Sequence, residues 1–338
     1  MNKRLSFLLS LAVVFLLFSA CKGVVKDANK PSSNPTEEPQ KEGNFKVGEV
    51  MVEMEKIEKI DEIILGHAHF DDNKPHKVAL DAYFMGKYEV TQELFDSIWG
   101  EAHHWHFTAE GETAPVEGEV QKLRPADHVT WFEAVAFCNM LTSKVDSLKE
   151  EVVYYSDANK TKAYTKEDAK GKADVYANWE KKGFRLPTVA EWEAAAKGKD
   201  ANALFSGATA DTEEEVKAVA WFDSNSDGKT HQVGKKRANG FGLFDMTGNV
   251  AEWCWDWCND IPENLKTVVK NPHGDTQDQA LGKTIRGGAF AYTYEKVENN
   301  ATAELCISYH DTVAPEGIIQ GLPESQYRYL GFRLAKSL

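Results

Sequence analysis

Two short runs of histidine carry the side chains most suited to binding a transition metal. They are HAH at 67–69 and HHWH at 103–106. Neither run places two histidines four residues apart beside a carboxylate, which is the pattern of a zinc hydrolase helix. We therefore expect no catalytic zinc centre at either run.

The cysteines offer little nucleophilic or metal chemistry. Cys254 and Cys258 have the four-residue spacing of a metal-binding pair on a helix, but no obvious His or Cys partner lies near them. Cys138 lies in an apolar run with helical periodicity, where a buried thiol is the simpler interpretation. The chain also has no Gly-x-Ser-x-Gly motif, P-loop or Rossmann fingerprint. No common catalytic motif is therefore present.

An acidic run, DSNSDG at 223–228, matches the opening half of an EF-hand calcium loop. A complete loop ends in a bidentate glutamate, whereas this chain has Gly234 at that position. A polar turn is therefore the preferred interpretation.

Threonine N-caps predict three short helices. Thr91 precedes an apolar helical pattern that stops at Gly100. Thr130 and Thr188 each have a glutamate three residues later, which predicts capping boxes, and the second of these helices should end at Gly198.

Each predicted helix follows a strand-like run, at 79–90, 125–129 and 184–186. Residues 143–183 are polar and irregular, and we expect them to run over the surface. After residue 198 the chain shows short extended pieces and turns, with 331–333 as a final strand. The pattern predicts an α+β domain with a large irregular fraction.

The first residues predict export and lipid anchoring. Lys3 and Arg4 precede an apolar run, and Ser19-Ala20-Cys21 follows it, which is typical of a lipoprotein signal cleaved before Cys21. An ordinary cleaved signal with a chance cysteine is the alternative. We divide the chain into a signal peptide (1–20), a flexible polar tether from the lipidated cysteine (21–44) and one domain (45–338).

Composition supports a folded, acidic domain. Of 338 residues, 42% are hydrophobic and 11% aromatic, which suffices for a core. The net charge of −14 disfavours binding to a phosphate backbone, so we expect no nucleic-acid partner.

Six segments share one order and spacing with a known family. They are KYEVTQELF at 87–95, VTWFEAVAFCNML at 129–141, GFRLPTVAEWEAAAKG at 183–198, GLFDMTGNVAEWCWDW at 242–257, RGGAF at 286–290 and LGFRLA at 330–335. This series resembles the formylglycine-generating enzyme, or sulfatase-modifying factor, domain family. The resemblance covers nearly all of 45–338 and implies the family's elaborated C-type-lectin-like fold.

The resemblance also implies that the family's catalysis is lost. Catalytic members oxidise a sulfatase cysteine with a serine directly after Arg-Gly-Gly and a copper-binding cysteine pair beyond it. Here Ala289 stands at the serine position, and Tyr292 and Val297 stand about where the cysteines would be. Soft thiolates select Cu(I), so we expect neither copper nor oxidase activity. The nearest branch is then a non-catalytic one diversified by retroelements, with a lipid-anchored spirochaete member.

The family often holds calcium at the turn before Glu-Trp. Carried over position by position, the ligands are the Asp245 side chain, the Gly248 and Val250 carbonyls and Glu252. These are the hard oxygen donors that calcium prefers, so the resemblance implies a calcium site.

Large amphipathic side chains alternate in the segment 289–329. In an extended chain, residues two apart share one face. Tyrosine offers a large contact area at low entropic cost, and this stretch is the variable ligand face in the non-catalytic relatives. The alternative, in which the tyrosines pack in the core, remains open. We predict one exposed binding face formed by Tyr292, Tyr294, Ile307, Tyr309, Asp311, Tyr327 and Tyr329.

Two function classes follow. The first is a surface-displayed, lipid-anchored, non-catalytic protein of the bacterial outer membrane that binds a protein or other surface ligand through a variable segment 289–329. The second is an envelope enzyme or maturation factor with altered chemistry. A nearby reverse transcriptase gene and an imperfect copy of the last coding segment would distinguish the first.

Overall fold

The computed structural model describes residues 41–274, 280, 282–297, 303–317 and 328–338. The predicted signal peptide, Cys21 and the tether up to residue 40 lie outside the described residues, as does Tyr327. Contacts group Lys41–Leu338 into one unit. Within the described part of the chain, no helix is long and apolar enough to cross a membrane.

The helices begin where the threonine caps predict them. The hydroxyls of Thr91, Thr130 and Thr188 each accept a hydrogen bond from the backbone N–H three residues later, and the last two form full capping boxes. Gly100 ends the helix that begins after Thr91 with a φ of 80°, and Gly198 ends the helix that begins after Thr188 with a φ of 62°. The helices are α1 (Gln92–Trp99), α2 (Trp131–Lys144), α3 (Lys166–Lys170), α4 (Val189–Lys197) and α5 (Glu213–Val219), with 3₁₀ turns at Gly111–Thr113 and Gln121–Leu123.

The strands form several small sheets. One has the order β13-β12-β10-β14, a second β3-β6-β15-β9 and a third β11-β5-β4, beside the pairs β1-β2 and β7-β8. The bounds are β1 (Phe45–Val47), β2 (Val50–Val52), β3 (Met54–Ile57), β4 (Ile60–Leu65), β5 (His76–Leu80), β6 (Tyr83–Gly86), β7 (Tyr154–Tyr155), β8 (Tyr176–Ala177), β9 (Phe184–Arg185), β10 (Ala251–Trp257), β11 (Asn264–Lys270), β12 (Lys283–Arg286), β13 (Asp311–Val313), β14 (Leu330–Gly331) and β15 (Ala335–Ser337).

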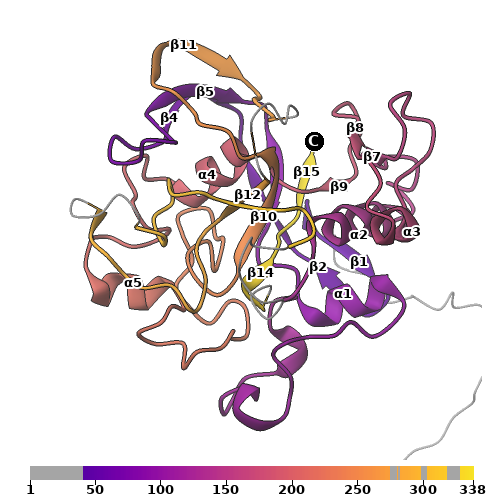
Figure 1. The fold of residues 1–338 in the computed structure, drawn as a ribbon, viewed down its shortest axis with the longest axis horizontal. Coiled ribbons are helices and arrows are strands. Elements are labelled where there is room, and N and C mark those ends of the chain that lie inside the picture. Colours follow the sequence, from indigo (N-terminus) through magenta and orange to yellow (C-terminus); the bar gives the residue numbers. More distant parts are fainter. Residues whose placement is uncertain (1–40, 275–279, 281, 298–302, 318–327) are drawn as a thin grey trace, which may run out of the picture. The chain divides into compact units, whose positions relative to one another are not determined.

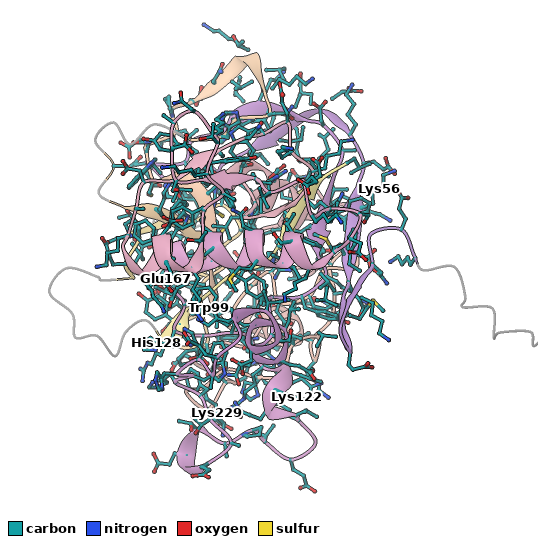
Figure 2. The ribbon with its side chains drawn as sticks, turned by 90° about the vertical axis from the view of Figure 1, so that its right-hand side faces the viewer. Lys56, Trp99, Lys122, His128, Glu167 and Lys229 are labelled. Atoms are coloured by element: carbon teal, nitrogen blue, oxygen red, sulfur yellow. The ribbon has the colours of Figure 1, made fainter. Side chains whose placement is uncertain are left out.

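The helices cover both sides of the strands β10 and β12 (Figure 1). On one side, Phe95 of α1 stacks on Phe137 of α2 with ring centroids 5.0 Å apart, and Trp131 packs on Trp255 of β10. On the other side, α4 contacts β10, β12 and β4. Figure 2 shows the α1 side, on which Lys166 of α3 donates to the Trp99 carbonyl at 2.9 Å. Apolar burial on both faces thus holds β10 and β12 in the interior.

The stretch 143–183 runs over the surface for most of its length, as expected, but a few of its side chains are anchored in the core. Tyr154 and Tyr164 in this stretch are fully buried. The Asn139 amide of α2 donates to both of their backbone carbonyls, at 2.7 and 3.0 Å. One polar side chain inside a helix therefore anchors the excursion in the core.

Other local predictions also change. The run 125–129 forms no strand and only bridges Thr91 through Pro125, while 79–90 breaks between β5 and β6. Of the predicted final strand 331–333, only Gly331 lies in a strand, β14, and β15 begins at Ala335. Cys254 and Cys258 belong to the β10 region rather than to a helix. The polar turn predicted at 223–228 is confirmed.

Candidate ligand-binding face

The Arg-Gly-Gly passage anchors the C-terminal segment from inside the molecule. Arg286, at the end of β12, is buried and donates to the carbonyls of Ile307 and Tyr309 at 3.0 and 3.1 Å. Gly288 has a φ of 68°, and a Cβ there would lie 2.8 Å from the carbonyl oxygen of Glu304. The glycine thus lets two stretches of the segment lie against one another.

Glu193 of α4 holds the same segment from below. It accepts hydrogen bonds from Arg286 at 3.0 Å, from the Ser308 hydroxyl at 2.8 Å and from the Gly66 backbone at 2.7 Å. Burial by itself would raise the pKa of Glu193, but the charges of Arg286 and Lys197 outweigh it and hold the pKa at about 2. The carboxylate is therefore ionised and fully engaged in positioning the chain.

Residues 308–311 alternate as an extended chain does. Ser308 and His310 are buried, whereas Tyr309 and Asp311 are half-buried and face the other way. Ile307 does not follow this pattern and is 0% exposed. Its place on an exposed face is therefore a wrong prediction, because its side chain packs in the core with Trp192 and Cys254.

The structure brings several of the predicted face residues together. The rings of Tyr292 and Tyr329 lie 5.8 Å apart between centroids. Burial and then the negative charge of Asp311 raise the pKa of Tyr329 to about 12. Burial likewise raises the pKa of Tyr309, with Asp311 and Glu304 as the next contributors. These mutual effects show that three tyrosines and two carboxylates share one neighbourhood.

Sequence reasoning missed Glu304, the fifth member of this neighbourhood. It lies outside the two-residue alternation that predicted the others, so no sequence signal could have found it. We call the set Tyr292, Glu304, Tyr309, Asp311 and Tyr329 the tyrosine face.

Tyr294 does not join the tyrosine face. Its hydroxyl donates to Asp211 at 2.8 Å, and its ring packs on Phe205. The expectation that Tyr292 and Tyr294 share a strand face is wrong, since residues 291–296 form no strand.

Two residues that the sequence resemblance places at catalytic positions of the family are packed in the interior. Ala289 and Val297 are both 0% exposed. The nearby Cys306 is a free, buried thiol whose pKa is raised to about 12 by burial. A thiol held in this protonated state is a poor ligand for copper and a poor nucleophile.

The calcium ligands implied by the resemblance do not fit the geometry. Asp245 has one buried oxygen without a hydrogen-bond partner, as a calcium ligand could have. Both oxygens of Glu252, however, are occupied by Arg333, and one also accepts from the Trp192 indole at 2.7 Å. Among the described residues, no group of three or more His, Cys, Asp or Glu side chains is arranged to hold a metal. The carboxylate of Glu252 is therefore engaged by a guanidinium rather than free to bind a cation.

The histidine runs have packing roles. His67 stacks on His69 with centroids 5.2 Å apart, and His103 stacks on Trp105 at 4.4 Å. The rings of His103 and Phe95 also make a T-shaped contact, so this histidine belongs to the aromatic cluster around α1.

Comparisons with known proteins agree with the fold and the motifs. The solved structure of Treponema denticola variable protein 1 is 34% identical, with a TM-score of 0.71 over 87% of this chain and 98% of that chain. This is the spirochaete member to which the sequence resemblance pointed. Chaperone protein LppX of Paenibacillus barcinonensis is 34% identical over 219 residues, covering 57% of this chain and 69% of that protein.

The enzymes of the family match a shorter stretch. The formylglycine-generating enzyme of Mycobacterium tuberculosis is 43% identical over 129 residues, so the match covers 35% of this chain and 42% of the enzyme. The predicted α+β fold of the formylglycine-generating-enzyme type is confirmed by these similarities. The family model described as sulfatase-modifying factor enzyme 1-like domain matches residues 25–338. The chain therefore belongs to the sulfatase-modifying factor enzyme 1-like domain family.

Proposed function

We propose that this protein is a lipid-anchored, surface-displayed and non-catalytic ligand-binding protein. Its binding site is the tyrosine face, within the variable segment 289–329. The observation that carries this proposal is that Tyr292, Tyr309 and Tyr329 lie close to Asp311. They come from distant parts of the segment, since Tyr292 and Tyr329 are 37 residues apart in the sequence. Tyrosine is enriched at protein-binding surfaces, because its ring offers a large contact area at low entropic cost.

The scaffold supports this proposal. Arg286 and Glu193 fix the buried side of the segment, so the outward side chains can change without loss of the fold. Similarity to a spirochaete protein described as variable agrees with such a division of labour. Diversification by a retroelement, anchoring through Cys21 and location at the outer membrane are parts of the same proposal.

Absence of the family's oxidation chemistry is a further part. Ala289 and Val297 supply no hydroxyl or thiol, and Tyr292 supplies no thiol. A sulfatase peptide that contains the target cysteine, incubated with copper and the protein, should yield no formylglycine. Formation of formylglycine, absent from a control without the protein, would instead support the enzyme class.

A maturation role is the second candidate, favoured by the similarity to a protein described as a chaperone. A chaperone surface would bind unfolded chains of many sequences, whereas a variable face should select few folded ligands. Binding to an unfolded reference protein, such as reduced casein, separates these two candidates.

The tyrosine face is tested by comparing surface proteins captured by the wild type with those captured by the double variant Asp311→Arg, Tyr329→Ser. Tyr176→Ser alters a half-buried tyrosine of β8 and is the matched control. Ligands of the face should be lost with the double variant and kept by the control. Equal capture by all three proteins would reject this face as the binding site.

A further inference from the structure

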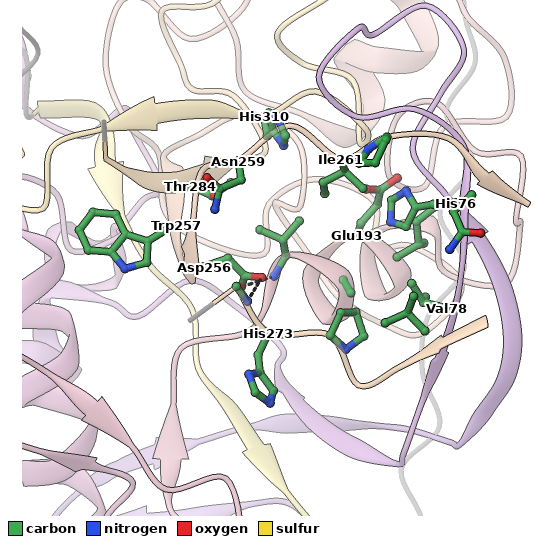
Figure 3. A pocket seen from close by; sticks show the side chains of 18 residues that line it. His76, Val78, Glu193, Asp256, Trp257, Asn259, Ile261, His273, Thr284 and His310 are labelled. Atoms are coloured by element: carbon green, nitrogen blue, oxygen red, sulfur yellow. Dashed lines mark hydrogen bonds between the residues drawn. The ribbon is translucent and has the colours of Figure 1, made fainter. Parts of the chain in front are cut away.

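A cavity lies inside the fold, between α4, the strands β5 and β11 and the ends of β10 and β12 (Figure 3). Its volume is about 490 Å³, within the usual range for small-molecule sites. The inner end is closed by buried side chains, among them Leu65, Val78 and Ala190. The outer rim is formed by exposed residues such as Val269 and Pro262. The cavity is thus a pocket with an apolar interior and an open mouth.

Three histidines, His76, His273 and His310, are among the polar residues that line this pocket. The Nδ1 atom of His76 donates to the backbone carbonyl of Lys74 at 2.8 Å, so Nε2 of the neutral ring is left as an acceptor. His310 lines the same pocket, and its side chain is only 3% exposed. Its Nε2 lies 3.3 Å from Asp72, and its buried Nδ1 has no hydrogen-bond partner among the described residues. The rings of His76 and His310 therefore each have one nitrogen to which no described group donates a hydrogen bond.

The charges around the pocket disfavour an anionic ligand. Glu193 and Asp256 line it, and no Lys or Arg is among the described residues that do. The carboxylate of Glu193 is already neutralised by Arg286. Asp256 accepts from the backbone of Val189 and Gly274 at 2.9 and 2.8 Å, and burial raises its pKa. The carboxylates thus have internal partners and do not call for a cationic ligand.

We propose that this pocket binds a small, uncharged organic molecule with an apolar body and a hydroxyl donor, of which phenols are the simplest class. The apolar walls bury the body of the molecule. The hydroxyl donates to Nε2 of His76, which leaves no polar ligand group unpaired. This site is separate from the tyrosine face and does not depend on the function proposed above.

The proposal is tested with p-cresol, toluene and 4-methylbenzoate as probes. The full chain in lipid vesicles is titrated with each probe by calorimetry, and protein-free vesicles supply the blank. We expect saturable 1:1 binding of p-cresol, binding of toluene that is about tenfold weaker because it lacks the donor, and no binding of the benzoate.

Three variants test where p-cresol binds. Ala190→Leu fills the pocket and should abolish p-cresol binding, whereas Ala82→Leu lines a neighbouring cavity and should leave it unchanged. His76→Phe should weaken p-cresol binding to the level of toluene, and melting curves verify that each variant is folded. Lack of binding by the wild type, equal binding by a folded Ala190→Leu protein, or preference for the benzoate would each overturn the proposal.

Discussion

Arg333 and Glu252 form a fully buried ion pair that joins two sequence motifs. The Arg333 Nε lies 2.6 Å from one carboxylate oxygen, and the terminal nitrogen lies 2.5 Å from the other. Arg333 also donates to the carbonyls of Gly86 and Phe244, each at 3.0 Å. The guanidinium therefore links β6, β10 and the turn before β10 to the segment between β14 and β15.

Loss of one member of this pair should be costly. Arg333→Met leaves Glu252 buried without its counter-charge, which typically destabilises by about 3–5 kcal/mol. Replacing both, with Glu252→Leu added, should cost less than Arg333→Met alone. Urea unfolding measures both values. The control is Lys170→Met, in an exposed pair with Glu167 that should contribute less than about 1 kcal/mol. Equal effects of Arg333→Met and Lys170→Met would contradict the prediction.

Calcium should not stabilise the protein. A ligand that binds only the folded state raises its melting temperature, so removal of a resident ion would lower it. Because Arg333 takes both oxygens of Glu252, we expect the melting temperature to be the same with excess chelator and with millimolar calcium. A drop on chelation that calcium restores would show that the ion displaces Arg333.

Asp127 should make stability depend on pH. Burial raises its pKa to about 7, although the carboxylate accepts from the His106 backbone at 2.7 Å and from Gln92 at 3.2 Å. The folded state then binds a proton that the unfolded state releases near pH 4, so this contribution is full below pH 4 and is lost as the pH rises through 7.

The test of Asp127 is a difference between two proteins. Relative to Asp127→Asn, the wild type should lose stability between about pH 4 and pH 7, by at most about 1.4 kcal/mol per pH unit. Denaturant unfolding at several pH values measures this difference and cancels the other carboxylates. If the stability of the wild type relative to Asp127→Asn stays constant or increases with pH, a raised pKa of Asp127 is ruled out.

Ile307 and Asp311 should respond differently to substitution. Ile307→Ala removes a fully buried side chain and should cost about 2–5 kcal/mol. Asp311→Asn changes a half-buried polar group of the tyrosine face and should cost less than about 1 kcal/mol. Thermal or denaturant unfolding compares them. If Asp311→Asn destabilises as much as Ile307→Ala, the face is part of the core.

Cys21→Ala tests the lipid anchor. Without the thiol that carries the lipid, the protein should leave the membrane fraction or keep its signal peptide and run at a higher mass. Detergent partitioning and mass spectrometry measure both effects, and Cys138→Ala is a cysteine control. Unchanged partitioning and mass would contradict lipidation at this residue.

The sequence alone determined the features that rest on neighbouring residues. Thr91, Thr130 and Thr188 predicted helix starts correctly because an N-cap hydrogen bond reaches only three residues along the chain. The predicted alternation holds for Tyr309 and Asp311, though not for Ile307, because side-chain direction in an extended chain follows from the backbone. The motifs identified the family and its fold for the same reason, because each is a short run of neighbouring residues and the runs occur in a fixed order along the chain.

Only the tertiary structure decided which of these side chains face solvent and which meet. Ile307 is buried and Tyr294 pairs with Asp211 because of elements packed against them, which periodicity does not reveal. Glu252 was a plausible calcium ligand in the sequence, but in the fold its carboxylate is bound by Arg333, which lies 81 residues later in the chain. Likewise, the pocket joins His76 to His310 across most of the chain. Contacts between distant segments depend on how whole elements pack, and no local spacing encodes that packing.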